Sequence, residues 1–167
     1  DVVRDTWAMA TPIPSPGVFG HTGALSGNTL VYIDGAARRT SGVKYGLVPQ
    51  SWSGEINPAN PLEIRWSPIA PHPGPPLYRA AAGACGAAIV FAGGTDNPYN
   101  YNGVGYDGRP SQPRAAVFDW DTGRRQWREW SSAPRATMDH RGLVIRGDSA
   151  WIPGGMLHGQ KVTAEFT

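Results

Sequence analysis

The sequence has little cysteine, little charge and no long apolar run. Its one cysteine, Cys85, excludes an intrachain disulfide framework and any metal site built from several cysteines. Only 17% of the 167 residues are charged, and the net charge of +2 comes from dispersed basic residues, so we expect no nucleic-acid partner. No apolar stretch is long enough for a membrane span, and there is no signal-peptide pattern.

What the chain does contain indicates a folded β protein. Hydrophobic residues make up 40% of it and aromatic residues 10%, including seven tryptophans, which is enough to bury a core. The 22 glycines and 16 prolines separate short apolar runs, and helical periodicity is nearly absent. We therefore predict a single all-β domain over residues 1–167, with about twelve short strands and no helix longer than two turns in 78–131.

A unit of about 60 residues repeats along the chain. Each copy has two apolar runs joined by a tight glycine-containing turn, followed by a glycine pair or its equivalent. Aligning the copies places three residues in one column, 58 and 61 residues apart: Ala36, Gly94 and Gly155. Three tryptophans follow nearly the same spacing, 59 and 61 residues: Trp7, Trp66 and Trp127. We expect Trp66 and Trp127 to occupy equivalent, largely buried positions.

Each unit predicts four antiparallel strands. In the most regular unit these are 79–84, 87–92, 115–119 and 125–130. The last two are joined at Asp121-Thr122-Gly123, where the aspartate can bond its own backbone and the glycine can adopt a positive φ. Four strands per repeat with glycine and aromatic markers are typical of a β-propeller blade. The expected repeats are 11–70, 71–131 and 132–167, preceded by an N-terminal strand in 1–10.

The second unit resembles the kelch motif. Gly93-Gly94 ends a β-run, VFDWDTGRRQW (117–127) places a Trp eight residues after an Asp, and SAPRATMDHRG (132–142) supplies a Pro-Arg stretch. The match is close over 78–156 and weaker over 20–70, where Gly35-Ala36 replaces the glycine pair and a Pro/Asn-rich insertion is expected at 49–61. The resemblance implies a kelch-like β-propeller with about three four-stranded blades.

Three blades do not close a ring, because propellers have about four to eight. Segment 162–166 aligns with the third strand at 115–118, and the Trp7 segment aligns with a fourth strand, so the two ends are complementary. We expect either a homodimer that forms a six-bladed ring or further blades, six or seven in total, in a longer protein. The chain opens at Asp1, which indicates a removed leader or a longer product. The sequence slightly favours a periplasmic or secreted location and does not decide the compartment.

The loops between second and third strands should emerge where the first strands begin. One of them is the long insertion 95–114, whose aromatic and amide groups suit a sugar or a peptide. Its candidate ligand-binding residues are Tyr99, Asn100, Tyr101, Asn102, Tyr106 and Arg109. The starts of the first strands add His21, Arg79, His140 and Arg141. We expect Tyr99, Tyr101, Asn102 and Arg79 to share one cleft. The alternatives are that the loop covers a neighbouring blade and that the arginines bond inter-blade backbone.

These residues predict a binding module for a carbohydrate or protein partner. The resemblance also implies enzyme alternatives: a sialic-acid mutarotase or epimerase, or a copper enzyme of the galactose-oxidase type. Asp139 beside His140 could supply acid/base chemistry. Cys85 falls in a hairpin turn on the opposite face, and the four histidines have no metal-ligand spacing, so we expect no metal and no cofactor. Since the sequence has no evident catalytic pair, we favour binding over catalysis.

Overall fold

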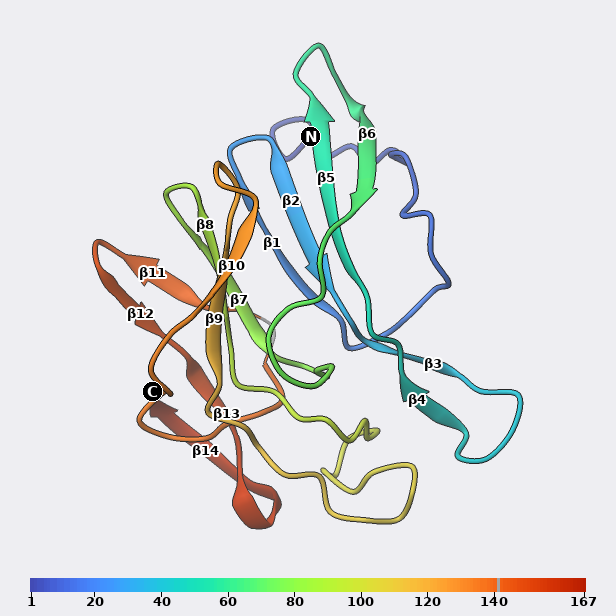
Figure 1. Ribbon diagram of the computed structural model, residues 1–167, viewed down its shortest axis with the longest axis vertical. Coiled ribbons are helices and arrows are strands. Elements are labelled where there is room, and N and C mark those ends of the chain that lie inside the picture. The colour runs from blue at the N-terminus through green and yellow to red at the C-terminus, as the bar shows by residue number, and fades with distance from the viewer. Residues whose placement is uncertain (141) are drawn as a thin grey trace.

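The computed structural model describes residues 1–140 and 142–167, and it confirms the all-β fold (Figure 1). Blade 1 is a four-stranded antiparallel sheet in the order β1–β2–β5–β6. Its strands are β1 (Thr22–Ser26), β2 (Thr29–Ile33), β5 (Ser51–Asn57) and β6 (Asn60–Pro68). Blade 2 has the order β7–β8–β9–β10. Its strands, each close to the predicted range, are β7 (Ala81–Cys85), β8 (Ala88–Ala92), β9 (Val117–Asp121) and β10 (Gln126–Glu129).

The third repeat is a partial blade. It consists of β11 (Val144–Arg146), β12 (Ser149–Trp151), β13 (Pro153–Leu157), the 3-10 turn η1 (His158–Gln160) and β14 (Lys161–Phe166). β14 pairs with β13 as the returning arm of a hairpin. In blade 1 the end of the second strand, Ile33, pairs with Ser51, the first residue of the third strand. The equivalent pair in the third repeat is Pro153 and Phe166, so its third-strand position begins only at Phe166. The expectation that the whole of 162–166 is a third strand is therefore wrong.

Three backbone bridges set the register between repeats and correct the predicted alignment. They are Phe19–Ala36, Tyr78–Thr95 and Met138–Met156. In each bridge a glycine comes directly before the second residue: Gly35 before Ala36, Gly94 before Thr95 and Gly155 before Met156. Gly35, and not Ala36, therefore aligns with Gly94 and Gly155. The residues following the first partner are Gly20, Arg79 and Asp139, all with positive φ (65°, 53° and 68°). Arg79 thus aligns with Gly20 and Asp139, not with His21; Arg141 lies outside the described residues.

The insertion expected at 49–61 is also misplaced. That segment contains β5, which pairs with both β2 and β6. Pro49 and Pro58 flank the strand, where proline costs no ladder hydrogen bond. The insertion of blade 1 is instead the hairpin of β3 (Ala36–Arg38) and β4 (Tyr45–Leu47).

Trp66 and Trp127 occupy equivalent positions. Trp66 pairs with Gly54 on β5, and Trp127 pairs with Trp120 on β9. The Trp66 indole donates to the Thr11 carbonyl at 3.0 Å and the Trp127 indole to that of Ala70 at 2.7 Å. Both side chains are half-buried, less than predicted, because one end of each indole stays at the outer edge of its blade.

The N-terminal segment contains no strand within residues 1–10, and Trp7 is 93% exposed. Thr11 contacts the outer strand of blade 1 through a hydrogen bond from its backbone N–H to the Leu62 carbonyl (2.8 Å). Pairing of the Trp7 segment with another chain or blade stays a prediction.

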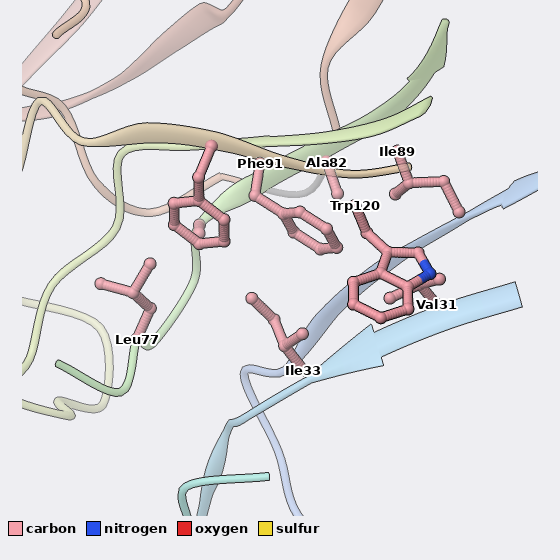
Figure 2. Packing of buried hydrophobic residues seen from close by; sticks show 9 residues of the cluster. Val31, Ile33, Leu77, Ala82, Ile89, Phe91 and Trp120 are labelled. Carbon is pink, nitrogen blue, oxygen red and sulfur yellow. The ribbon is translucent and has the colours of Figure 1, made fainter. Parts of the chain in front are cut away.

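The main core lies between blades 1 and 2 (Figure 2). Val31 and Ile33 of β2 pack against residues of β8 and β9, and all of these are at most 3% exposed. The blade 2 residues in this cluster include Ile89, Phe91, Phe118 and Trp120. Each such side chain contributes about 1.5–3 kcal/mol by leaving water, so this interface fixes one blade against the next.

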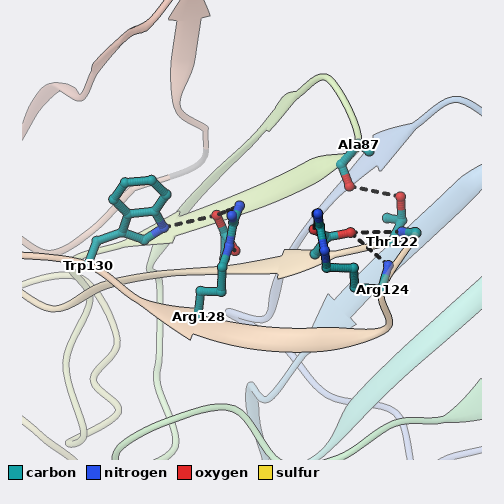
Figure 3. A network of polar contacts seen from close by, with 8 residues as sticks. Ala87, Thr122, Arg124, Arg128 and Trp130 are labelled. Carbon is teal, nitrogen blue, oxygen red and sulfur yellow. Dashed lines mark hydrogen bonds and ion pairs between the residues drawn. The ribbon is translucent and has the colours of Figure 1, made fainter.

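A polar network holds the outer edge of blade 2 (Figure 3). Arg128 donates two hydrogen bonds to the Asp119 carboxylate, at 3.0 and 2.8 Å, and the Trp130 indole donates a third at 2.9 Å. Asp121 accepts the backbone N–H groups of Gly123 and Arg124, which confirms the predicted aspartate bond, but the positive φ of this turn is at Arg125 (56°) and not at Gly123 as predicted. These bonds also lower the pKa of Asp121.

Candidate functional site

One end of the blades carries all three connections between second and third strands (Figure 1). They are the β3–β4 hairpin, the loop 95–114 and the β13–β14 hairpin. The first strands β1, β7 and β11 begin at this same end, as predicted, because successive strands in each blade are antiparallel. The candidate site is built where these connections meet the starts of the first strands.

Arg79 joins the three repeats at this end. Its backbone N–H donates to the Gly20 carbonyl at 2.8 Å, and its carbonyl accepts the His140 N–H at 3.1 Å. Its φ of 53° is unusual for a residue with a side chain, and the aligned position in blade 1 is a glycine. The fold therefore holds Arg79 in a conformation that costs backbone energy, which makes its side chain a candidate for function.

The Arg79 guanidinium lies among an acid and two aromatic rings. It donates to the Asp139 carboxylate at 2.7 Å and lies 5.0 and 5.1 Å from the ring centres of Tyr78 and Tyr99. Burial alone would lower the pKa of Arg79, but the charges of Tyr78 and Asp139 raise it above its usual value. The site thus contains a permanent, firmly oriented cation.

Tyr99 reaches this cluster from the loop 95–114. Its side chain is fully buried, and its hydroxyl has no hydrogen-bond partner among the described residues. Burial, followed by the charge of Asp139, raises the pKa of Tyr99. The Tyr78 hydroxyl donates to the Tyr99 carbonyl at 2.8 Å, so the loop is anchored to the start of β7.

A cleft of about 570 Å³ opens beside Arg79. Its polar and aromatic lining includes His21, Thr22, Tyr32, Trp66, Arg79 and His140. The ring centres of His21 and Tyr32 lie 4.8 Å apart, whereas the Thr22 side chain lies on the core face of the sheet, because Thr22 pairs with the core residue Ile33. Aromatic faces beside a cation and a hydroxyl suit a polar ligand with an apolar face, such as a sugar.

None of the candidate residues of the loop 95–114 lines the cleft, and Tyr99, which contacts Arg79, is fully buried. Tyr101 is 78% exposed, and Asn100, Asn102 and Arg109 are also exposed; none of the four lines the cleft. The expected convergence of Tyr101 and Asn102 with Arg79 is therefore wrong. Local bonds set the shape of the loop, such as those that the Asn102 and Asp107 side chains accept from Val104 and Arg109 backbone N–H groups.

The loop also covers its neighbours, which was the alternative expectation. The Gln160 amide donates to the Ser111 carbonyl at 3.1 Å, so the loop contacts the third repeat. The ring centre of Tyr106 lies 4.7 Å from that of Tyr45 in the β3–β4 hairpin and 6.5 Å from that of Phe19. Tyr106 thus ties the loop to blade 1 instead of facing Arg79.

His140 is buried, and its Nε2 lies 2.8 Å from the Thr137 hydroxyl. Its ring packs directly on Gly155, which leaves no room there for a Cβ atom. Asp139, its neighbour in sequence, pairs with Arg79. Both side chains are therefore engaged in holding the site together.

Among the described residues, no group of three or more His, Cys, Asp or Glu side chains is placed to hold a metal ion. Cys85 is exposed at the β7–β8 turn, at the other end of blade 2 from Tyr99. In the same part of the chain, no helix has the length and hydropathy to cross a membrane.

Two aromatic lining residues, Tyr32 and Trp66, were not among the sequence candidates. Tyr32 alternates with Val31 and Ile33 on β2, so its side chain lies on the opposite face of blade 1 from the core. Trp66 served only as a marker of the repeat. The strand alternation of LVYI (30–33) could have placed Tyr32 on the face opposite Val31 and Ile33.

Comparison with known proteins identifies the fold and no more. No family model matches the chain, and no curated protein matches it. A solved structure, that of YjhT, superposes on 99% of this chain with a TM-score of 0.74 and 17% sequence identity. The chain spans 46% of the length of YjhT. The all-β, kelch-like propeller fold expected from the sequence is thereby confirmed.

Proposed function

We propose that this chain is a ligand-binding module whose cleft beside Arg79 holds a carbohydrate or an extended peptide. The observation that carries the proposal is the position of Arg79, a partly buried cation whose backbone is held at positive φ beside a cleft with aromatic walls. Arg79 offers donors for hydroxyl or carboxylate groups, and its ion pair with Asp139 holds it in place. Tyr32 and Trp66 offer flat apolar surface for a sugar face or a side chain.

In this proposal the exposed loop residues form an outer rim. Asn100, Tyr101, Asn102 and Arg109 are exposed and carry amide, hydroxyl and cationic groups, although they do not line the cleft. They would contact the parts of a longer ligand that project from the cleft. Cleft residues should therefore dominate affinity, and rim residues should tune it.

One observation favours an enzymatic alternative, a sugar mutarotase. His21 lines the cleft, and burial lowers its pKa below 6.5, which favours the neutral imidazole. A neutral imidazole can accept the proton of an anomeric hydroxyl, which begins ring opening. Asp139 and His140 are engaged elsewhere, which leaves His21 as the candidate base for this alternative.

The test is a glycan array followed by NMR of the bound sugar. For a binding module, His21→Ala and Tyr32→Ala should each weaken affinity by about tenfold or more, with no exchange between anomers above the background rate. For a mutarotase, the wild type should accelerate anomer exchange and His21→Ala should abolish it. Arg109→Ala is the matched control and should change affinity little. Binding that resists both cleft substitutions would overturn the proposal.

A further inference from the structure

We propose that the uncovered face of blade 1 binds the third repeat of a second copy of this chain. The front face of blade 1 is defined here by Leu25, Leu30, Tyr32, Trp52 and Trp66. The rear face of the third repeat is defined by Val144 and Trp151. The inference concerns assembly, and it involves the ligand cleft as well, because Leu30, Tyr32 and Trp66 of the front face also line the cleft.

The front face of blade 1 repeats a face that is buried in blade 2. Leu30 and Tyr32 correspond to Ile89 and Phe91, each pair 59 residues apart. In blade 2, Ile89 and Phe91 are 0% exposed, because Val31 and Ile33 from the rear of blade 1 cover them (Figure 2). In blade 1, Leu30 and Tyr32 are only half-buried, and Leu25 beside them is 47% exposed.

The rear face of the third repeat lacks its cover in the same way. Val144 and Trp151 lie 120 residues after Ala24 and Val31, the residues of blade 1 that face blade 2. Val31 is 1% exposed, whereas Trp151 is 37% exposed and Val144 is 53% exposed. One chain therefore presents both halves of the contact that joins its own blades 1 and 2.

A second copy supplies both missing halves at once. With twofold symmetry, each front face meets the rear face of the other copy, so two contacts form and no open apolar face of this kind is left. The kelch-like neighbour YjhT is long enough for two such chains, since this chain spans 46% of it. Docking would also place Trp151 of the second copy against Tyr32 and Trp66, so the second copy would cover this side of the cleft beside Arg79.

The first experiment measures molar mass by light scattering across micromolar concentrations. We expect about 36 kDa, twice the 17.9 kDa of the chain. Leu25→Lys or Trp151→Lys should each weaken self-association by about tenfold or more, because each buries a charge in one of the faces. Val43→Lys, between β3 and β4, is the control and should leave the mass unchanged. Circular dichroism confirms that every variant stays folded.

The second experiment tests which faces meet. In a Cys85→Ser background, Leu30→Cys and Trp151→Cys are made as separate proteins and treated with a short bis-maleimide. A mixture of the two should give crosslinked dimer, and each protein alone should give little. A monomer at all concentrations, a dimer unaffected by Trp151→Lys, or equal crosslinking in the unmixed samples would each overturn the proposal. All three readouts are independent of ligand binding.

Discussion

Nε2 of His72 lies 2.6 Å from Oδ2 of Asp34, with both side chains at most 4% exposed. Nδ1 of the same ring lies 2.8 Å from the Pro73 carbonyl, so both nitrogens face acceptors and the imidazole is held as a cation. Asp34 also accepts the Leu77 N–H at 2.7 Å and the Gln50 N–H at 3.2 Å. This ion pair ties the proline-rich linker between blades 1 and 2 to the end of β2.

The Asp34–His72 pair predicts a stability that falls as pH rises. Burial lowers the pKa of His72, but its hydrogen bond to Asp34 and the charge of Asp34 outweigh this and raise it above 6.5. A raised folded-state pKa means that the contribution is complete below about pH 6.5 and is lost as pH rises through the folded value. Urea unfolding between about pH 5 and 9 should show this decline.

The matched variants for this test are His72→Gln and His158→Gln. His72→Gln should flatten the decline, whereas His158→Gln should keep it, because His158 is exposed on the β13–β14 hairpin. If the wild type and His72→Gln change in parallel with pH, the buried pair is not the cause.

Gly155 predicts a steep local requirement for glycine. Its φ is 108°, and a Cβ there would lie 2.9 Å from the Met138 carbonyl and against the His140 ring. We expect Gly155→Ala to reduce the free energy of unfolding by more than about 2 kcal/mol. Gly147→Ala also places alanine at positive φ (61°), but in open space, and should cost only about 1 kcal/mol. Urea midpoints that shift equally would show that backbone strain alone decides the cost.

The buried carboxylate of Asp119 gives a third prediction. Asp119 is 1% exposed, so removal of its partner in Arg128→Met leaves a buried charge without its guanidinium. The thermal midpoint of Arg128→Met should therefore fall clearly further than that of Arg124→Met. The Arg124 side chain, paired with Asp121, is 72% exposed and contributes little. Similar midpoints for the two variants would contradict this account of the network.

The repeat and the blade 2 strands could be predicted because their markers are local. Glycine turns and tryptophans keep a constant spacing, whichever blades surround them. The register of blade 1 could not be predicted, because Asp34 has the positive φ (54°) that a glycine has at this position in the other repeats. The glycine-pair pattern therefore predicts Ala36 at this position, one residue after Gly35. Prolines at both ends of β5 likewise concealed a strand that tertiary pairing holds in place.

The site was predictable only in part, for a related reason. Arg79 and His21 lie at the starts of first strands, and the strand topology alone places these starts at the end of the blades that carries the candidate site. The directions of Tyr99 and Tyr101 depend on loop contacts with no period, so alternation in the sequence could not separate the buried tyrosine from the exposed one. Tyr32 was not predicted because the exposure of its side chain depends on whether another blade covers its face of the sheet.

The last prediction separates a binding role for Arg79 from a structural one. Arg79→Gly relieves the positive φ, as Gly20 shows at the aligned position, but it leaves the Asp139 carboxylate without its partner. The single variant should therefore lose both stability and affinity for the ligand found by the array. Adding Asp139→Asn removes the unpaired charge, so the double variant should regain most of the stability. If Arg79 contacts the ligand, affinity in the double variant stays at least about tenfold below the wild type. If affinity returns together with the thermal midpoint, Arg79 only holds the repeats together and the ligand binds elsewhere.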